Sequence, residues 1–279
     1  MRVIVAIFFL PILAMAQGSQ PGLSNSQFSD YLTAYSHTEN PSSFSGDGIE
    51  HFMTKLSAKK ETFKSEKMFL GYVFTKTHQR FLKEFQEYAT FQQTLTKGRY
   101  NCLTGTALYA LILEHLDLRY QIIETNHHIF LLAETNDGKI LFEATDPLNG
   151  FVSSDPEIEK RIETYKKTNL PQTGTDKMYY RFNVELFNPI DLEELQGLLH
   201  YNQAVEAYNR KDLSSSINHL EKAARLYYSP RIEEFSKILH LTVFESKLDQ
   251  SSKENFLRKI QSLRNNRAQA VASASVKSY

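Results

Sequence analysis

The chain of 279 residues contains a single cysteine, Cys102, within the segment GRYNCLTGTALYALILEHL. The apolar residues Leu108, Leu111 and Ile112 recur at helical spacing, which predicts a helix that begins at or near Cys102. The unpaired N–H groups and positive dipole end of a helix N-terminus favour a negative charge, so a thiol there is suited to act as a thiolate nucleophile. A buried thiol that packs as a small apolar side chain is the alternative.

The two segments that follow have strand character. HIFLLAE and KILFEAT flank Asp137-Gly138, a dipeptide typical of two-residue hairpin turns. The sequence therefore predicts the order cysteine helix, strand (YQIIET) and β-hairpin.

This hairpin carries the other groups that thiol chemistry needs, namely a base and a group that orients the base. His127 and His128 point to opposite faces of a strand, so His128 can face the cysteine helix while His127 cannot easily do so. The returning strand brings a carboxylate alongside His128, either Glu143 or Asp146. The opposed histidines, with no third ligand at metal-site spacing, make a zinc site an unfavoured interpretation, and no metal or cofactor is expected.

At these positions the sequence resembles the transglutaminase-like cysteine superfamily. The matches are Cys102 in YNCLTGTALY, His128 with Phe130 in HHIFLLAE, and Glu143 in FEAT, within about residues 66–151. The resemblance implies an α+β fold with a papain/transglutaminase-like core, in which the helix bearing the cysteine packs on a small antiparallel sheet. It also implies a triad of Cys102, His128 and Glu143.

Three departures from the superfamily pattern concern the site and its surroundings. The acid is Glu143 rather than the commoner Asp, and Asp146, three residues on, is the alternative acid in a competing register. Tryptophan, frequent near the superfamily's histidine, is absent from the chain, so Phe130 must pack there. Asp117 stands where the superfamily often has a glycine, the residue that best tolerates a left-handed cap.

Acyl-transfer chemistry also needs donors for a developing oxyanion. Backbone N–H groups at the start of the helix, including that of Cys102, are the first candidates. Tyr100, Gln92 and Gln93 are candidate side-chain donors for the oxyanion or substrate.

The N-terminus resembles a secretory signal peptide. Met1-Arg2 gives a positive start, an apolar run follows from Val3 to Leu13, and Ala14-Met15-Ala16 predicts cleavage after Ala16. The run is too short to cross a bilayer, which takes about 20 apolar residues. We therefore expect a secreted or periplasmic protein with no integral membrane segment after cleavage.

Outside the candidate site, the spacing of apolar and small residues predicts further helices and a division of the chain into segments. YNQAVEAYNRKDLSSSINHLEKAARLYYSP alternates small and large residues and resembles a tetratricopeptide-type helix pair. We further expect a short helix over 25–35, a long amphipathic helix over 66–91 and a solvated helix face over 157–167. The predicted organisation is a signal peptide (1–16), a flexible N-terminal lead-in (17–48), a transglutaminase-like domain (49–190), a helical tetratricopeptide-like segment (191–264) and a disordered tail (265–279).

The charge composition argues against one class of partner. Lys plus Arg and Asp plus Glu are equal at 32 each, so no strongly basic face predicts a nucleic-acid partner. The first hypothesis is an exported thiol enzyme that cleaves or transfers an acyl group of a peptide or carboxamide through a Cys102 thioester, with hydrolysis favoured. The alternative is a catalytically inactive module that binds a peptide or protein partner through the C-terminal helices.

Overall fold

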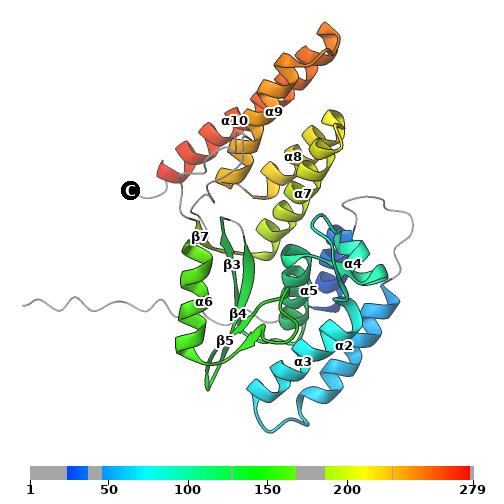
Figure 1. The fold of residues 1–279 in the computed structure, drawn as a ribbon, viewed down its shortest axis with the longest axis vertical. Helices are drawn as coiled ribbons and strands as arrows, with labels where there is room; N and C mark the ends of the chain where they lie inside the picture. The colour runs from blue at the N-terminus through cyan, green and yellow to red at the C-terminus, as the bar shows by residue number, and fades with distance from the viewer. Residues whose placement is uncertain (1–23, 37–45, 127, 168–185, 228, 277–279) are drawn as a thin grey trace, which may run out of the picture.

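The computed structural model describes residues 24–36, 46–126, 128–167, 186–227 and 229–276. These residues form an α+β structure in which helices surround a five-stranded antiparallel sheet (Figure 1). The helices are α1 (Asn25–Ser36), α2 (Asp47–Lys60), α3 (Glu66–Phe81), α4 (Phe91–Lys97), α5 (Cys102–His115), α6 (Asp155–Lys167), α7 (Leu192–Asn209), α8 (Leu213–Leu226), α9 (Pro230–Glu245) and α10 (Gln250–Val276). The strands are β1 (Glu84–Phe85), β2 (Arg99–Tyr100), β3 (Tyr120–Thr125), β4 (Ile129–Thr135), β5 (Gly138–Phe142), β6 (Phe151–Val152) and β7 (Phe187–Ile190).

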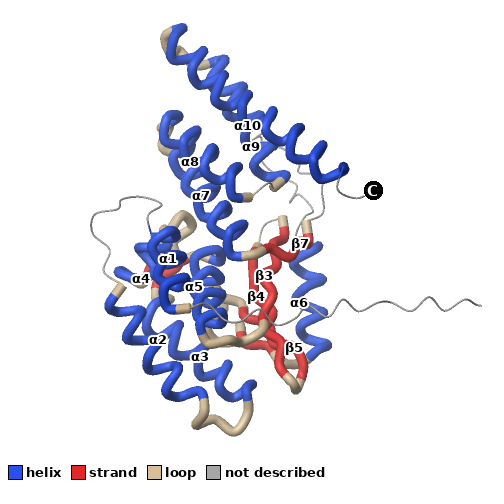
Figure 2. Tube along the Cα trace, turned by 180° about the vertical axis from the view of Figure 1, so that it is seen from behind, coloured by secondary structure: helices blue, strands red, loops and turns tan. Residues whose placement is uncertain are grey.

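The sheet has the strand order β6-β5-β4-β3-β7 and is covered on both faces. On β4, Leu131 and Ala133 belong to the main core with α5, whereas Phe130 and Leu132 pack in a smaller cluster with Ile158 of α6. This alternation is the period of two that the sequence shows. Helices α5 and α6 therefore lie on opposite sides of the predicted hairpin (Figure 2).

The hairpin forms as predicted, but its turn lies one residue earlier than expected. Thr135 pairs with Gly138, so Asn136 and Asp137 make the turn. The Thr135 side chain accounts for this position, because its Oγ1 accepts the N–H of Asp137 (3.2 Å) and donates to the carbonyl of Gly138 (2.8 Å).

Helix α5 is the centre of the main core. Every residue from Thr104 to Leu113 is buried, because the helix contacts α1, α4 and α7 as well as β3 and β4. The helix ends at His115 with Leu116 as its C-cap, and Asp117 follows with φ of 49°, a left-handed conformation. The sequence identified this as a position that favours glycine.

The long helix predicted over 66–91 is wrong beyond Phe81. The N–H groups of Lys83 and Glu84 both donate to the carbonyl of Gly98 (2.9 and 3.0 Å), and β1 pairs in parallel with β2. A new helix, α4, begins after Thr90, whose side chain forms a capping box with Gln93. Pairing with a strand 15 residues away, together with this cap, overrides the helical period of the apolar residues.

Two expectations at the chain's ends also change. The short helix predicted over 25–35 is confirmed as α1, but it is part of the main core rather than a flexible lead-in, because Phe28, Leu32 and Tyr35 are buried there. At the other end α10 continues to Val276, although a disordered tail was expected from residue 265. The added stretch is rich in alanine and lacks glycine and proline, a composition that favours helix. The predicted signal peptide lies outside the described residues.

The helices that follow residue 191 include the predicted helix pair, α7 and α8, which pack closely together. A second core joins Ala204 of α7 to α8, α9 and α10, with Leu220, Leu239 and Ile260 among its fully buried members. No helix within the described residues is both long and apolar enough to cross a membrane.

Gly105 lets α5 approach the segment that follows β5. A Cβ built on Gly105 would lie 2.6 Å from the Cβ of Ala144. We expect Gly105→Ala to reduce the free energy of unfolding by about 1–3 kcal/mol through overpacking, as measured by urea denaturation.

Gly48→Ala is the matched control, because its built Cβ meets only Arg80, at 3.9 Å, within helix α2. This substitution should be neutral or stabilising by up to about 1 kcal/mol, as expected for alanine in a helix. Equal effects of the two substitutions would contradict a close approach at Gly105.

Candidate active site

Cys102 is the first residue of α5, as the sequence predicts. Asn101 caps the helix: its side chain accepts the N–H of Thr104 (2.9 Å), and Thr104 Oγ1 accepts the N–H of Asn101 (3.1 Å). The Asn101 amide also donates to the carbonyl of Glu87 (2.7 Å), which anchors the cap to the loop before α4. This cap leaves the N–H groups of Cys102 and Leu103 without an acceptor inside the helix. Cys102 is a free, half-buried thiol.

His128 immediately precedes β4 and is held by its backbone. The N–H of His128 donates to Thr125 Oγ1 (3.1 Å), while the N–H and Oγ1 of Thr125 both donate to the His128 carbonyl (2.8 and 3.0 Å). At the next residue, Thr106 of α5 donates to the carbonyl of Ile129 (3.3 Å). The start of β4 is therefore fixed to both β3 and the helix that carries Cys102.

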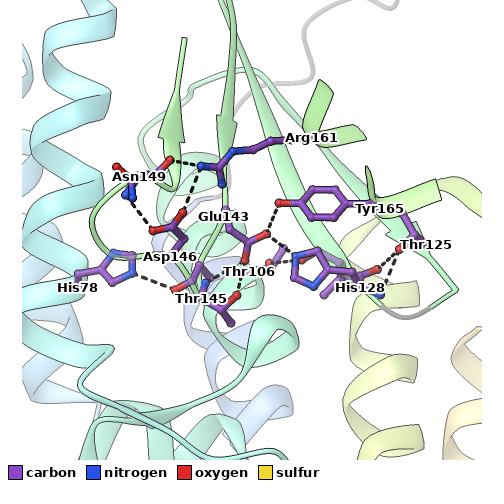
Figure 3. Close-up of polar contacts among 12 residues, drawn as sticks. His78, Thr106, Thr125, His128, Glu143, Thr145, Asp146, Asn149, Arg161 and Tyr165 are labelled. Carbon is purple, nitrogen blue, oxygen red and sulfur yellow. Dashed lines mark hydrogen bonds and ion pairs between the residues drawn. The ribbon is translucent and has the colours of Figure 1, made fainter. Parts of the chain in front are cut away.

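Glu143 follows β5 and is almost completely buried, at 3% exposure. Its Oε2 contacts Nε2 of His128 and accepts the hydroxyl of Tyr165 (2.9 Å), as Figure 3 shows. Its Oε1 accepts the N–H and the hydroxyl of Thr145 (2.9 and 2.6 Å). Four donors thus compensate a charge that burial alone would disfavour.

The electrostatics make His128 and Glu143 an ion pair. Burial acts to lower the pKa of His128, but hydrogen bonds with Cys102 and Glu143 and the charge of Glu143 outweigh it and raise this pKa to about 10. Burial acts to raise the pKa of Glu143, but the hydrogen bond and charge of His128 and the donors of Thr145 lower it. Because Nε2 is bound to Glu143, Nδ1 is the ring nitrogen left for the thiol.

Of the two candidate acids, Glu143 is the one that contacts His128. Asp146 forms an ion pair with Arg161 of α6 (3.2 Å) and accepts the N–H of Asn149 (2.9 Å). It thereby closes the turn after β5 instead of orienting the imidazole.

The candidate donors lie near Cys102 in sequence but differ in placement. Tyr100 is buried in the main core, and its ring is within 3.4 Å of a Cβ built on Gly105. Gln92 and Gln93 lie in the first turn of α4, where the Gln93 side-chain oxygen accepts the N–H of Thr90 (3.2 Å) to complete the capping box. The N–H groups of Cys102 and Leu103, in the first turn of α5, lie next to the thiol in the chain.

Helix α6 contributes to the site in a way that was not expected from the sequence. The stretch 157–167 was expected to be a solvated helix face, but Ile158 is buried against the sheet and Tyr165 reaches the site. The Tyr165 ring also lies 4.7 Å from the His128 ring, between centroids. The spacing of Ile158, Ile162 and Tyr165, at steps of four and three, was the signal that could have identified this buried face.

A second histidine, His78 of α3, supports the acid from the opposite side. Its ring is buried, with Nε2 2.9 Å from the Ala144 carbonyl and Nδ1 2.6 Å from the Tyr109 hydroxyl. Burial lowers the pKa of His78. A neutral ring that donates from Nε2 and accepts at Nδ1 satisfies both contacts, so His78 fixes the backbone next to Glu143.

The described part of the chain holds no group of three or more His, Cys, Asp or Glu side chains that could bind a metal ion. Comparisons with protein-family models, with curated proteins and with solved structures find no match to this chain. The interpretation of the site therefore depends on its own geometry.

The ion pair predicts a pH dependence of stability. An unfolded histidine has a pKa near 6.5, whereas the folded value for His128 is about 10. The pair stabilises the fold fully below about pH 6.5, and its contribution is lost as the pH rises through 10. Urea denaturation between about pH 6 and pH 10 should give a falling free energy of unfolding, with a smaller fall in His128→Gln.

His51→Gln, at an exposed position of α2, is the control and should keep the slope of the unmodified protein. An identical slope in His128→Gln and the unmodified protein would show that His128 holds no extra proton in the fold.

The Tyr165 hydroxyl offers a separate test of the buried carboxylate. Tyr165→Phe removes one donor from Glu143 and should lower the free energy of unfolding by about 1–2 kcal/mol at neutral pH. Tyr72→Phe, in α3 on a ring that packs against Phe63, controls for loss of a hydroxyl and should have little effect. Equal losses in both variants would argue against a stabilising bond from Tyr165 to Glu143.

Proposed function

We propose that this protein is a thiol acyl hydrolase with a transglutaminase-like core, which acts on a peptide or carboxamide after export. The observation that carries the proposal is the position of His128, whose Nε2 contacts the Glu143 carboxylate and which lies close enough to Cys102 for the thiol to raise the pKa of the imidazole. Cys102 also begins a helix, where a thiolate is favoured. Nucleophile, base and orienting acid are thus in the order that covalent thiol catalysis requires.

In the first half of the reaction, the Cys102 thiolate attacks the carbonyl carbon and a carbon–sulfur bond forms. The carbonyl oxygen becomes an oxyanion, which the N–H groups of Cys102 and Leu103 stabilise. The His128 imidazolium then gives its proton to the leaving nitrogen, the carbon–nitrogen bond breaks and an amine departs. Glu143 keeps the imidazole oriented and stabilises its charged form.

In the second half, neutral His128 takes a proton from water as the water oxygen attacks the thioester. The carbon–sulfur bond breaks, the carboxylic acid leaves and Cys102 returns to the thiolate paired with the imidazolium. An amine in place of water would give transfer instead of hydrolysis. Hydrolysis is favoured because Cys102 is only half-buried and an exported protein meets water everywhere.

The reactivity of Cys102 tests this proposal. Iodoacetamide should alkylate the full-length protein rapidly near neutral pH, and His128→Ala should slow alkylation by at least about tenfold, because the thiolate loses its cationic partner. Mass spectrometry of the single cysteine gives the rate. His51→Ala is the matched histidine control and should react like the unmodified protein.

The same experiment separates the alternative, a non-catalytic module that binds a peptide or protein. Exposed Leu241 and Phe244 on α9 favour such a surface. A thiol that is alkylated only after unfolding would support the binding module and contradict the thiol enzyme. If the thiol is reactive, a peptide p-nitrophenyl ester should release p-nitrophenol and give a transient acyl-Cys102 adduct and free acid. With an added amine, amide formed faster than in Cys102→Ala would show transfer, because amines also attack this ester directly.

A further inference from the structure

A buried ion pair joins the C-terminal helices to the sheet next to the candidate site. Glu124, near the end of β3, is 1% exposed. Its Oε1 accepts Nε of Arg231 from α9 (2.6 Å), and its Oε2 accepts the hydroxyl of Tyr227, directly after α8 (2.5 Å). The Tyr227 hydroxyl in turn accepts the amide of Asn188 from β7 (3.1 Å). One carboxylate therefore ties together β3, β7 and two parts of the helical segment.

Arg231 also reaches beyond Glu124. Its Nη2 donates to the carbonyl of Thr125, the residue whose side chain and N–H hold the backbone of His128. The contacts run without a gap from α9 through Thr125 to the imidazole-bearing residue. The planar guanidinium suits this arrangement, since it presents Nε to the carboxylate and Nη2 to the carbonyl in one fixed fork.

The sequence around Arg231 is organised to present this side chain. Ser229 caps α9 and Pro230 is its first residue, so Arg231, the second residue, lies on a rigid first turn. The guanidinium is only partly exposed, and Glu124 neutralises its charge. Removal of either partner would leave a buried charge without compensation, which identifies the pair as a fixed structural joint.

We propose that Arg231 is a positioning residue for His128. By holding Glu124 and the Thr125 carbonyl together, it sets the turn that aims the imidazole at Cys102, so the C-terminal helices complete the candidate active site. This inference rests on the proposed function, since it assigns the helical segment a role in the same thiol chemistry.

Arg231→Lys is the discriminating variant. The ammonium group keeps a positive charge beside Glu124 but cannot bind the carboxylate and the Thr125 carbonyl in the same fork. We expect the midpoint of thermal unfolding to change little, while the rate of iodoacetamide alkylation of Cys102 falls about tenfold, since small misplacements of a catalytic group are costly. The pH midpoint of the His128 imidazole proton signal should also move down from near 10, because the bonds that raise the pKa weaken.

Arg225→Gln is the control, because Arg225 pairs with Glu221 on the exposed side of α8 (2.5 Å) within the same helical segment. It should change neither the alkylation rate nor the His128 signal. Wild-type alkylation and an unchanged His128 signal in Arg231→Lys would overturn the inference.

His128→Ala distinguishes the two proposals. If His128→Ala slows alkylation and Arg231→Lys changes neither the alkylation rate nor the His128 signal, the thiol enzyme stands and the positioning role fails. If Arg231→Lys moves the His128 signal but His128→Ala leaves alkylation unchanged, the joint positions His128 and the proposed function fails.

Discussion

The buried carboxylate of Glu143 is the constraint on which the candidate site depends. A carboxylate at 3% exposure is tolerated only when donors surround it, and those donors come from three places: Thr145 in its own turn, Tyr165 on α6 and His128 before β4. Each of these elements must be in place before the charge is compensated. Helix α6 supplies Tyr165 directly, and α5 fixes the start of β4 next to His128 through Thr106. The packing of both helices on the sheet is therefore linked to a single ionised group.

The sequence could predict the parts of this arrangement that depend on local signals. Helix capping is local, and Cys102 begins α5 because Asn101 and Thr104 form a capping box. Strand alternation is also local, and it sorts β4 between the two cores. The end of α3 at Phe81 was not predictable in this way, because it follows from pairing of β1 with a strand that lies after α4. Apolar residues at helical spacing look the same whether or not such a partner exists.

The choice between Glu143 and Asp146 shows the same limit at the level of the site. Either carboxylate could follow the second strand of the hairpin, and the pairing of Leu131 with Phe142 brings Glu143 alongside the start of β4. Asp146 is drawn away by Arg161, a residue 15 positions later whose direction depends on how α6 packs. The sequence indicates both acids, but only the long-range partners decide which one meets the imidazole. Tyr165 differs from this case, because the spacing of Ile158, Ile162 and Tyr165 marks a buried face of α6 in the sequence, although its contact with Glu143 depends on how α6 packs on the sheet.

The boundary predicted at residue 191 is a change of pattern rather than a gap between independent units. Helix α7 contributes Leu195, Leu198 and Leu199 to the main core around α5, and its later residue Ala204 belongs to the core of the C-terminal helices. The hydroxyl of Tyr35 in α1 binds the carbonyl of Leu192 (2.6 Å), so the start of α7 is also fixed to the N-terminal part of the fold. A single rigid helix thus spans both cores, and a displacement of the C-terminal helices would be opposed by apolar packing on α5 as well as by the joint at Glu124. Since α5 carries Cys102 and β3 holds the turn before His128, both partners of the thiol–imidazole pair are attached to the same helical segment.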